Sequence, residues 1–234
     1  MKKKILIGVL AVIVIAVVAI GYFVFADGQQ EQKLKDELTE INNLANATPI
    51  DVDAIYDKLG ETVTKGDYAI LETVMKSYLK DSFDNAIRIS ELLNDERITE
   101  ILTATNYQED GPDFVETKAY ITSTIQELET CKNNHQEYLT QEKAMSYIED
   151  KNLDEYYVNF YKDEIVKDME SNDTTVADSI DEIIAILQNS EKVIDFLIAN
   201  KNNWKIENDS IVFNNEDLSN QYMDLITQIW FFVK

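Results

Sequence analysis

Residues 176–197 read VADSIDEIIAILQNSEKVIDFL. Apolar residues recur in this stretch every three or four positions, which is the period of one face of an α-helix, and more apolar residues flank that face. They are Val176, Ile180, Ile183, Ile184, Ile186, Leu187, Val193, Ile194, Phe196 and Leu197. A helix this apolar needs packing partners on several sides. We therefore expect it at the centre of a helical bundle.

The rest of the chain offers helices to surround it. Breaks are few, because the chain beyond residue 26 contains only Gly28, Gly60, Gly66, Gly111, Pro49 and Pro112. Long helices with short connections are the consequence. Helical spacing of apolar residues and capping residues predict helices at about 29–45, 51–60, 67–94, 95–102, 112–139, 152–169 and 215–229.

The predicted helix at 112–139 carries a regular seam. Phe114, Ile121, Leu128 and His135 follow one another at intervals of seven, the spacing of residues that pack along a neighbouring helix. Pro112 is suited to the first helical position, directly after the turn-forming residues 108–111.

One segment departs from the helical pattern. Alternating residues Trp204–Glu207 and the β-prone run Ser210–Phe213 flank Asn208 and Asp209, which favour tight turns. A small β-hairpin at 204–213 is predicted, provided that Trp204 and Phe213 pack on helices. The fold class is thus all-α: a mainly antiparallel helical bundle with one small hairpin, preceded by an N-terminal transmembrane helix.

The transmembrane prediction rests on the first 26 residues. Lys2, Lys3 and Lys4 precede an uncharged apolar run from Ile5 to Ala26. As a helix this run is about 33 Å long, enough to cross the roughly 30 Å hydrocarbon core of a bilayer. The lysines mark the cytoplasmic side. We expect a cytoplasmic tail at 1–4, an anchor at 5–26, a stalk or first helix at 27–48 and an extracytoplasmic helical domain at 49–234.

A cleaved signal peptide is the alternative reading of the same segment. Val24, Phe25 and Ala26 precede a polar stretch and are acceptable to a signal peptidase, which would release the chain after Ala26. The apolar core is longer than the roughly 7 to 15 residues usual in signal peptides, so its length favours a retained anchor in the cell membrane.

The charge balance limits the classes of partner. The chain has 44 Asp and Glu against 21 Lys and Arg, and three of these lysines precede the anchor, which leaves 18 basic residues and a net charge of −26 beyond it. Such a surface repels nucleic acid, so no nucleic-acid partner is expected. It favours basic partners, with a strength that falls as salt rises.

Cysteine usage points to a bacterial exported protein. Cys131 is the only cysteine, so no intramolecular disulfide can form and stability must come from packing. The apolar and aromatic content beyond the anchor is sufficient for a core and unlike that of acidic disordered chains.

Few residues indicate chemistry. Cys131 and His135 are spaced i to i+4 with Glu127 one turn earlier, an arrangement that can supply two or three zinc ligands. Both Cys131 and His135 lie on or beside the apolar seam, however, and are more simply explained as core residues. The sequence lacks a phosphate-binding glycine-rich loop and a Gly-x-Ser-x-Gly motif, and we name no catalytic residue and no cofactor.

Three hypotheses of function follow. The leading one is a membrane-anchored, extracytoplasmic helical bundle that binds or scaffolds another protein of a bacterial cell envelope, with the lipid bilayer as its partner through residues 5–26. The second is an envelope enzyme or zinc-dependent hydrolase that uses Cys131, His135 and Glu127. The third is a secreted binding protein released after Ala26. A tail of four residues is too short to carry a kinase or other cytoplasmic domain.

Overall fold

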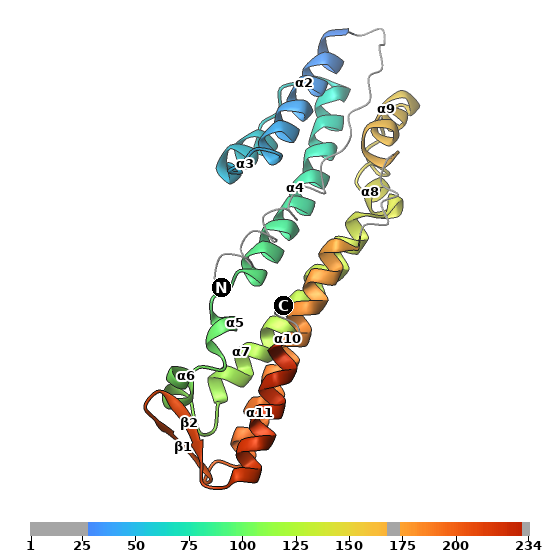
Figure 1. The fold of residues 1–234 in the computed structure, drawn as a ribbon. Helices are drawn as coiled ribbons and strands as arrows, with labels where there is room; N and C mark the ends of the chain where they lie inside the picture. The colour runs from blue at the N-terminus through green and yellow to red at the C-terminus, as the bar shows by residue number, and fades with distance from the viewer. Residues whose placement is uncertain (1–27, 168–173, 231–234) are drawn as a thin grey trace. The chain divides into compact units, whose positions relative to one another are not determined.

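The structure, a computed structural model, describes residues 28–167 and 174–230 (Figure 1). Helices and one two-stranded sheet follow in the order α2 (Gly28–Ala45), α3 (Val52–Gly60), α4 (Asp67–Leu93), α5 (Arg97–Glu100), α6 (Ala104–Glu109), α7 (Val115–Tyr138), α8 (Gln141–Ser146), α9 (Glu155–Tyr161), the π-helix η2 (Lys162–Val166), α10 (Thr175–Ala199), β1 (Trp204–Glu207), β2 (Ser210–Phe213) and α11 (Glu216–Trp230). The expectation of a mainly helical chain with one small hairpin is confirmed.

The elements belong to two compact units. Unit 1 contains the described residues up to Ser90 and from Asn133 to Lys167. Unit 2 contains Glu91–Lys132 and the described residues from Thr174 onward. The expected division into a segment at 27–48 and a domain at 49–234 stays a prediction. The side chains of α2 are nevertheless part of the core of unit 1, as expected of a first helix.

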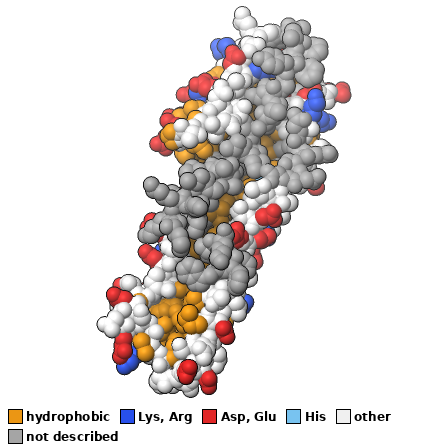
Figure 2. Space-filling view, in the orientation of Figure 1, with side chains coloured by type: hydrophobic (Ala, Val, Ile, Leu, Met, Phe, Trp, Pro, Cys, Tyr) orange, Lys and Arg blue, Asp and Glu red, His pale blue; other side chains and the backbone are white. Residues whose placement is uncertain are grey.

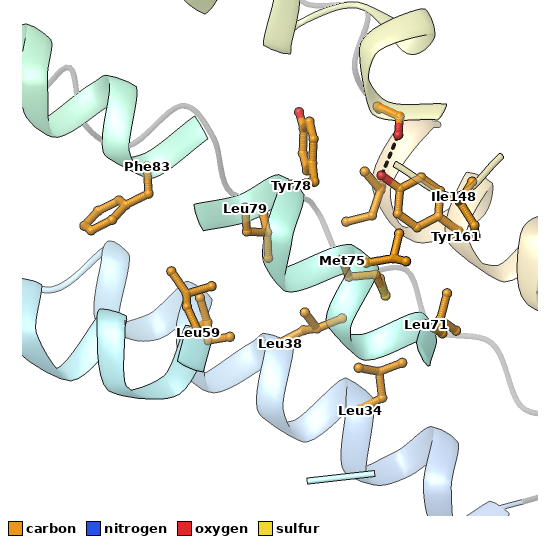
Figure 3. Packing of buried hydrophobic residues seen from close by; sticks show 14 of the residues in the cluster. Leu34, Leu38, Leu59, Leu71, Met75, Tyr78, Leu79, Phe83, Ile148 and Tyr161 are labelled. Carbon is orange, nitrogen blue, oxygen red and sulfur yellow. Dashed lines mark hydrogen bonds between the residues drawn. The ribbon is translucent and has the colours of Figure 1, made fainter. Parts of the chain in front are cut away.

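The core of unit 1 is formed by α2, α3 and α4 with the segment from α8 to η2. Leu34 and Leu38 of α2 point toward Leu71 and Met75 of α4 (Figure 3). The Tyr161 hydroxyl donates a 2.8 Å hydrogen bond to the carbonyl of Ala144, so this fully buried tyrosine has its polar atom satisfied.

The core of unit 2 surrounds α10 and the hairpin. Val176, Ile180, Leu187, Ile194 and Leu197 of the predicted stripe on α10 are buried, and so are Ile184 and Val193 beside it, whereas Ile183 of the stripe is half-buried. The two strands are antiparallel with Trp204 opposite Phe213, and Asn208 and Asp209 both have positive φ, as a two-residue turn of this kind requires.

Trp204 and Phe213 of the hairpin both pack on the helical part of unit 2. This packing is the condition under which the sequence predicts a stable hairpin. The Trp204 ring stacks on Phe114 with centroids 6.0 Å apart, and its Nε1 donates to the Leu197 carbonyl at 2.9 Å. The Phe213 ring lies 5.9 Å from Phe196 and 5.4 Å from Tyr222.

Two predicted helix starts are wrong. The helix expected from Pro112 begins at Val115, because Asp110 binds the amides of Glu116 and Thr117 at 3.2 and 2.7 Å and so caps the helix from before the proline. The helix expected from Asn152 begins at Glu155, since Asn152 has a positive φ of 50° that a helix does not accommodate.

Within residues 28–167 and 174–230, no helix combines the length and the apolar character needed to cross a bilayer. The predicted anchor at 5–26, the lysines Lys2, Lys3 and Lys4, and the alternative cleavage position after Ala26 all lie outside the described residues.

Candidate binding groove

An open groove of about 360 Å³ lies between α4 and the turn after α8 in unit 1. Its lining comes from α4 and from the turn that follows α8, and consists of Ala69, Ile70, Thr73, Val74, Ser77, Tyr147 and Lys151. Val74 is buried, whereas Ile70 is 42% exposed to solvent. An exposed isoleucine beside a buried valine makes this surface apolar.

The two hydroxyls of the groove do not change its character. Thr73 Oγ1 donates to the Ala69 carbonyl at 2.8 Å, and Ser77 Oγ donates to the Thr73 carbonyl at 2.7 Å. These donors are satisfied by the helix that carries them. A ligand would therefore meet mainly methyl and methylene groups along α4.

The opposite wall is held in place by Tyr147. Its hydroxyl donates to Asp81 Oδ2 at 2.6 Å, and its ring packs edge-on against Tyr78 with centroids 5.6 Å apart. Burial, and then the hydrogen bond to Asp81, raise the pKa of Tyr147, so its hydroxyl keeps its proton and donates it to Asp81. Lys151, which is exposed, adds one cation at the edge and forms no ion pair with the described part of the chain.

Charged side chains are buried on another face of α4. Glu72 and Lys76 are 0% and 2% exposed, and Lys76 Nζ lies 2.8 Å from Glu72 Oε1 and 2.8 Å from Glu37 Oε1. Glu72 also accepts hydrogen bonds from the amides of Val63 and Thr64 and from the Thr64 hydroxyl. This buried ionic cluster, defined as Glu37, Glu72, Lys76 and Thr64, fastens the loop before α4 to the helix.

The pKa values follow from these contacts. Burial alone would raise the pKa of Glu72, but the hydrogen bonds from Lys76, Thr64 and Val63 outweigh it and lower that pKa. Glu72 is therefore ionised and fully engaged at neutral pH. The cluster has a structural role and offers no reactive group to a ligand.

Glu164 is the second deeply buried carboxyl of unit 1. It lies in η2, where the Lys167 amide bonds to the Lys162 carbonyl at 2.9 Å, one residue further than in an α-helix. Glu164 is 2% exposed, and its Oε2 has no hydrogen-bond partner in the described part of the chain. Burial is the main reason that its pKa is raised.

The predicted metal ligands lie along α7. Cys131 is buried, as its assignment to the core requires, whereas Glu127 and His135 are half-buried. Among the described residues, no group of three or more His, Cys, Asp or Glu side chains is arranged to hold a metal ion. The zinc hypothesis gains no further ligand from the fold and stays a prediction.

The sequence did not indicate the groove. Its α4 residues share no apolar period, because Thr73 and Ser77 read as ordinary solvent-facing positions. Tyr147 and Lys151 come from a separate segment, so only the tertiary fold brings them to α4.

Comparison with known proteins gives no relative. No family profile matches the chain, and no similar curated protein and no similar solved structure was found.

Proposed function

We propose that the chain is a binding or scaffolding module of a bacterial cell envelope, anchored by residues 5–26 with its helical part outside the cytoplasm. The groove along α4 receives an apolar segment of another envelope protein. The observation that carries this proposal is the groove itself, which combines an exposed Ile70 with a lining whose hydroxyls are already satisfied.

The size and openness of the groove suit a peptide segment. Its volume of about 360 Å³ is at the lower end of the range of roughly 300–1,000 Å³ found for ligand pockets, and it is open to solvent. An amphipathic helix or an extended segment can place a few apolar side chains in such a groove while its polar side remains in water.

The acidic surface favours basic residues on the solvent-facing side of that partner. Acidic side chains are scattered over the face shown in Figure 2, and the net charge beyond the anchor is strongly negative. Because exposed charges are screened by salt, complex formation should weaken as ionic strength rises.

Site-specific photo-crosslinking in intact cells tests this function. A photoreactive amino acid replaces Thr73 in the full-length chain, and a matched control carries it at Thr39, an exposed position of α2 outside the groove. We expect one adduct, identified by mass spectrometry, at position 73 and not at position 39.

The substitution Ile70→Asp supplies the specificity control. Ile70 is exposed, so the change leaves the core of unit 1 intact while it places a charge on the apolar rim. The adduct at position 73 should fall at least about tenfold, which corresponds to a loss of about 1.4 kcal/mol. Equal adducts at positions 73 and 39, or an adduct insensitive to Ile70→Asp, would refute the groove as the binding site.

The mature N-terminus separates the anchored form from the secreted alternative. Mass spectrometry of the protein from cells should find residues 1–26 present if the chain is retained in the membrane. A mature chain beginning at Asp27 would instead support release by signal peptidase after Ala26.

A further inference from the structure

The end of unit 1 where α2 begins presents an exposed aromatic side chain. Tyr156 of α9 is 43% exposed. Its hydroxyl donates to Glu31 Oε2 at 2.9 Å and lies 3.1 Å from the Tyr68 hydroxyl. Its ring also packs edge-on against Tyr157, with centroids 5.3 Å apart. Tyr156 is therefore fixed to the first turn of α2 while part of its ring faces outward.

Lys65 lies at the same end. Its backbone amide donates to Gln30 Oε1 at 3.0 Å, which joins the loop before α4 to the first turn of α2. Its side chain is exposed and makes no ion pair with the described residues. We call Lys65 and Tyr156 the juxtamembrane pair.

The chain length places this pair close to the predicted membrane span. The apolar run ends at Ala26, and α2 begins at Gly28. Two extended residues reach at most about 7 Å, and the helix adds about 4.5 Å from Gly28 to Glu31. Glu31, which accepts the hydrogen bond from Tyr156, is thus within about 12 Å of Ala26, the end of the predicted span.

The charges at this end are compatible with a bilayer surface. The first two turns of α2 and the starts of α4 and α9, the latter two each taken with the two residues before it, carry Lys33, Lys35 and Lys65 against Glu31, Asp67, Asp154 and Glu155. Three positive and four negative charges make this end much less acidic than the chain as a whole, so headgroups are only weakly repelled there.

We propose that the juxtamembrane pair rests on the headgroup layer of the bilayer that holds residues 5–26, with Tyr156 at the lipid interface and Lys65 beside the lipid phosphates. This inference rests on the proposed membrane anchor. Tyrosine favours this layer because its ring is apolar and its hydroxyl is polar, and the long lysine side chain can reach a phosphate. The contact would hold unit 1 in a fixed orientation, and not as a freely swinging domain.

Spin labels on the full-length chain in phosphatidylcholine vesicles test the contact. Single cysteines are introduced by Lys65→Cys, Tyr156→Cys and Asn43→Cys in a Cys131→Ala background, and Val14→Cys reports on the span itself. Asn43 is exposed and lies about 22 Å along α2 from Gly28, so it is the matched control. For each spin label we measure the accessibility to oxygen, which partitions into lipid, and the accessibility to a water-soluble nickel complex. The ratio of the two accessibilities is then compared between positions.

We expect the oxygen-to-nickel ratio at positions 65 and 156 to exceed that at position 43 several-fold. The Lys65 side chain makes no hydrogen bond with the described residues, so Lys65→Cys should leave the fold intact. The label at position 65 therefore measures the contact with the bilayer even if Tyr156→Cys disturbs α9. Ratios at 65 and 156 equal to that at 43, with position 14 in lipid, would overturn this inference and leave the anchor standing. A water-exposed label at position 14 would overturn the anchor itself.

Discussion

Glu72 and Glu164 are both almost fully buried in unit 1, but their surroundings shift their pKa values in opposite directions. Glu72 receives hydrogen bonds from a lysine, a hydroxyl and two amides, which compensate for its lost hydration. Glu164 has an oxygen without a partner in the described part of the chain, so its desolvation is not compensated. One carboxyl contributes to stability at neutral pH, and the other reduces it.

Removing the ammonium of the buried ionic cluster should be costly. Lys76→Met leaves Glu37 and Glu72 buried without the cation that lies between them. Breaking a buried ion pair on one side costs about 3–5 kcal/mol, and we expect that loss in the free energy of unfolding measured with urea.

Lys80→Met is the matched control, one turn further along α4. Lys80 pairs with Asp84 at 2.6 Å, but the two side chains are 49% and 41% exposed and so remain in contact with water. The loss should be below about 1 kcal/mol, as for other surface pairs. Similar losses for the two variants would mean that the cluster is not buried as described.

Glu164→Gln should stabilise the protein at neutral pH. The folded-state pKa of Glu164 is raised above its unfolded value, so the ionised form opposes folding at high pH. This penalty shrinks as pH falls through the folded pKa and is gone below the unfolded pKa. Glutamine resembles the protonated acid and removes this penalty. The midpoint of thermal unfolding should therefore rise at pH 7.5, and the gain should shrink toward pH 4.5.

An exposed carboxyl of the same unit provides the comparison for this effect. Glu149→Gln should change the midpoint at pH 7.5 much less than Glu164→Gln does, because Glu149 is an exposed surface residue. A Glu164→Gln protein that is less stable than the parent at pH 7.5 would show that the carboxylate has a stabilising partner.

At the scale of single elements, most of the helices were predictable because their signals are local. Asp51 caps α3 through a 3.0 Å bond to the Ala54 amide, as its position before an amphipathic run indicates. Asn208 and Asp209 likewise indicated the tight turn of the hairpin, in which both residues have positive φ. These features depend on residues a few positions apart.

The start of α7 was not predictable in the same way. A proline before an apolar run favours the first helical position, but the cap is supplied by Asp110, which lies before the proline and reaches over it to Glu116 and Thr117. The buried position of Phe114 against Trp204 fixes this arrangement from a distant segment. The π-helix at Glu164 has no sequence signal that we identify.

Gly111→Ala should strongly destabilise unit 2. A Cβ at this position would lie 2.3 Å from the Tyr107 carbonyl oxygen, and 3.1 Å from Trp204 and 3.2 Å from Phe114. Because a backbone atom and two packed rings must move, we expect a loss of about 1–3 kcal/mol in the free energy of unfolding.

Gly60→Ala is the contrasting substitution. Nothing lies within 4 Å of a Cβ at Gly60, the last residue of α3. Alanine has the higher helix propensity, so stability should stay equal or rise by up to about 1 kcal/mol. A Gly111→Ala protein as stable as Gly60→Ala would contradict the close packing between α6 and the hairpin.

At the scale of the whole molecule, the sequence predicts the mainly helical fold class but not a binding site. The anchor and its orientation stay predictions, which rest on a continuous run of residues and three adjacent lysines. The groove instead joins successive turns of α4 to Tyr147 and Lys151, some 70 residues away. No local sequence pattern indicates a surface whose residues come together only after folding.

The proposed function therefore joins two kinds of evidence. Residues 5–26 carry the predicted membrane location, and unit 1 contains the groove and the juxtamembrane pair. If the helical part were inside the cell, neither an envelope partner nor the headgroups of the outer leaflet could reach these surfaces. Orientation is thus the claim on which the rest depends.

Labelling of Asn43→Cys with a membrane-impermeant maleimide, in intact and in lysed cells, tests that orientation most directly. Asn43 is exposed in unit 1, whereas the native Cys131 is buried and provides a low background. We predict that position 43 is labelled equally in intact and lysed cells and that the labelled chain remains with the membranes after an alkaline wash. Labelling that appears only after lysis would contradict the account.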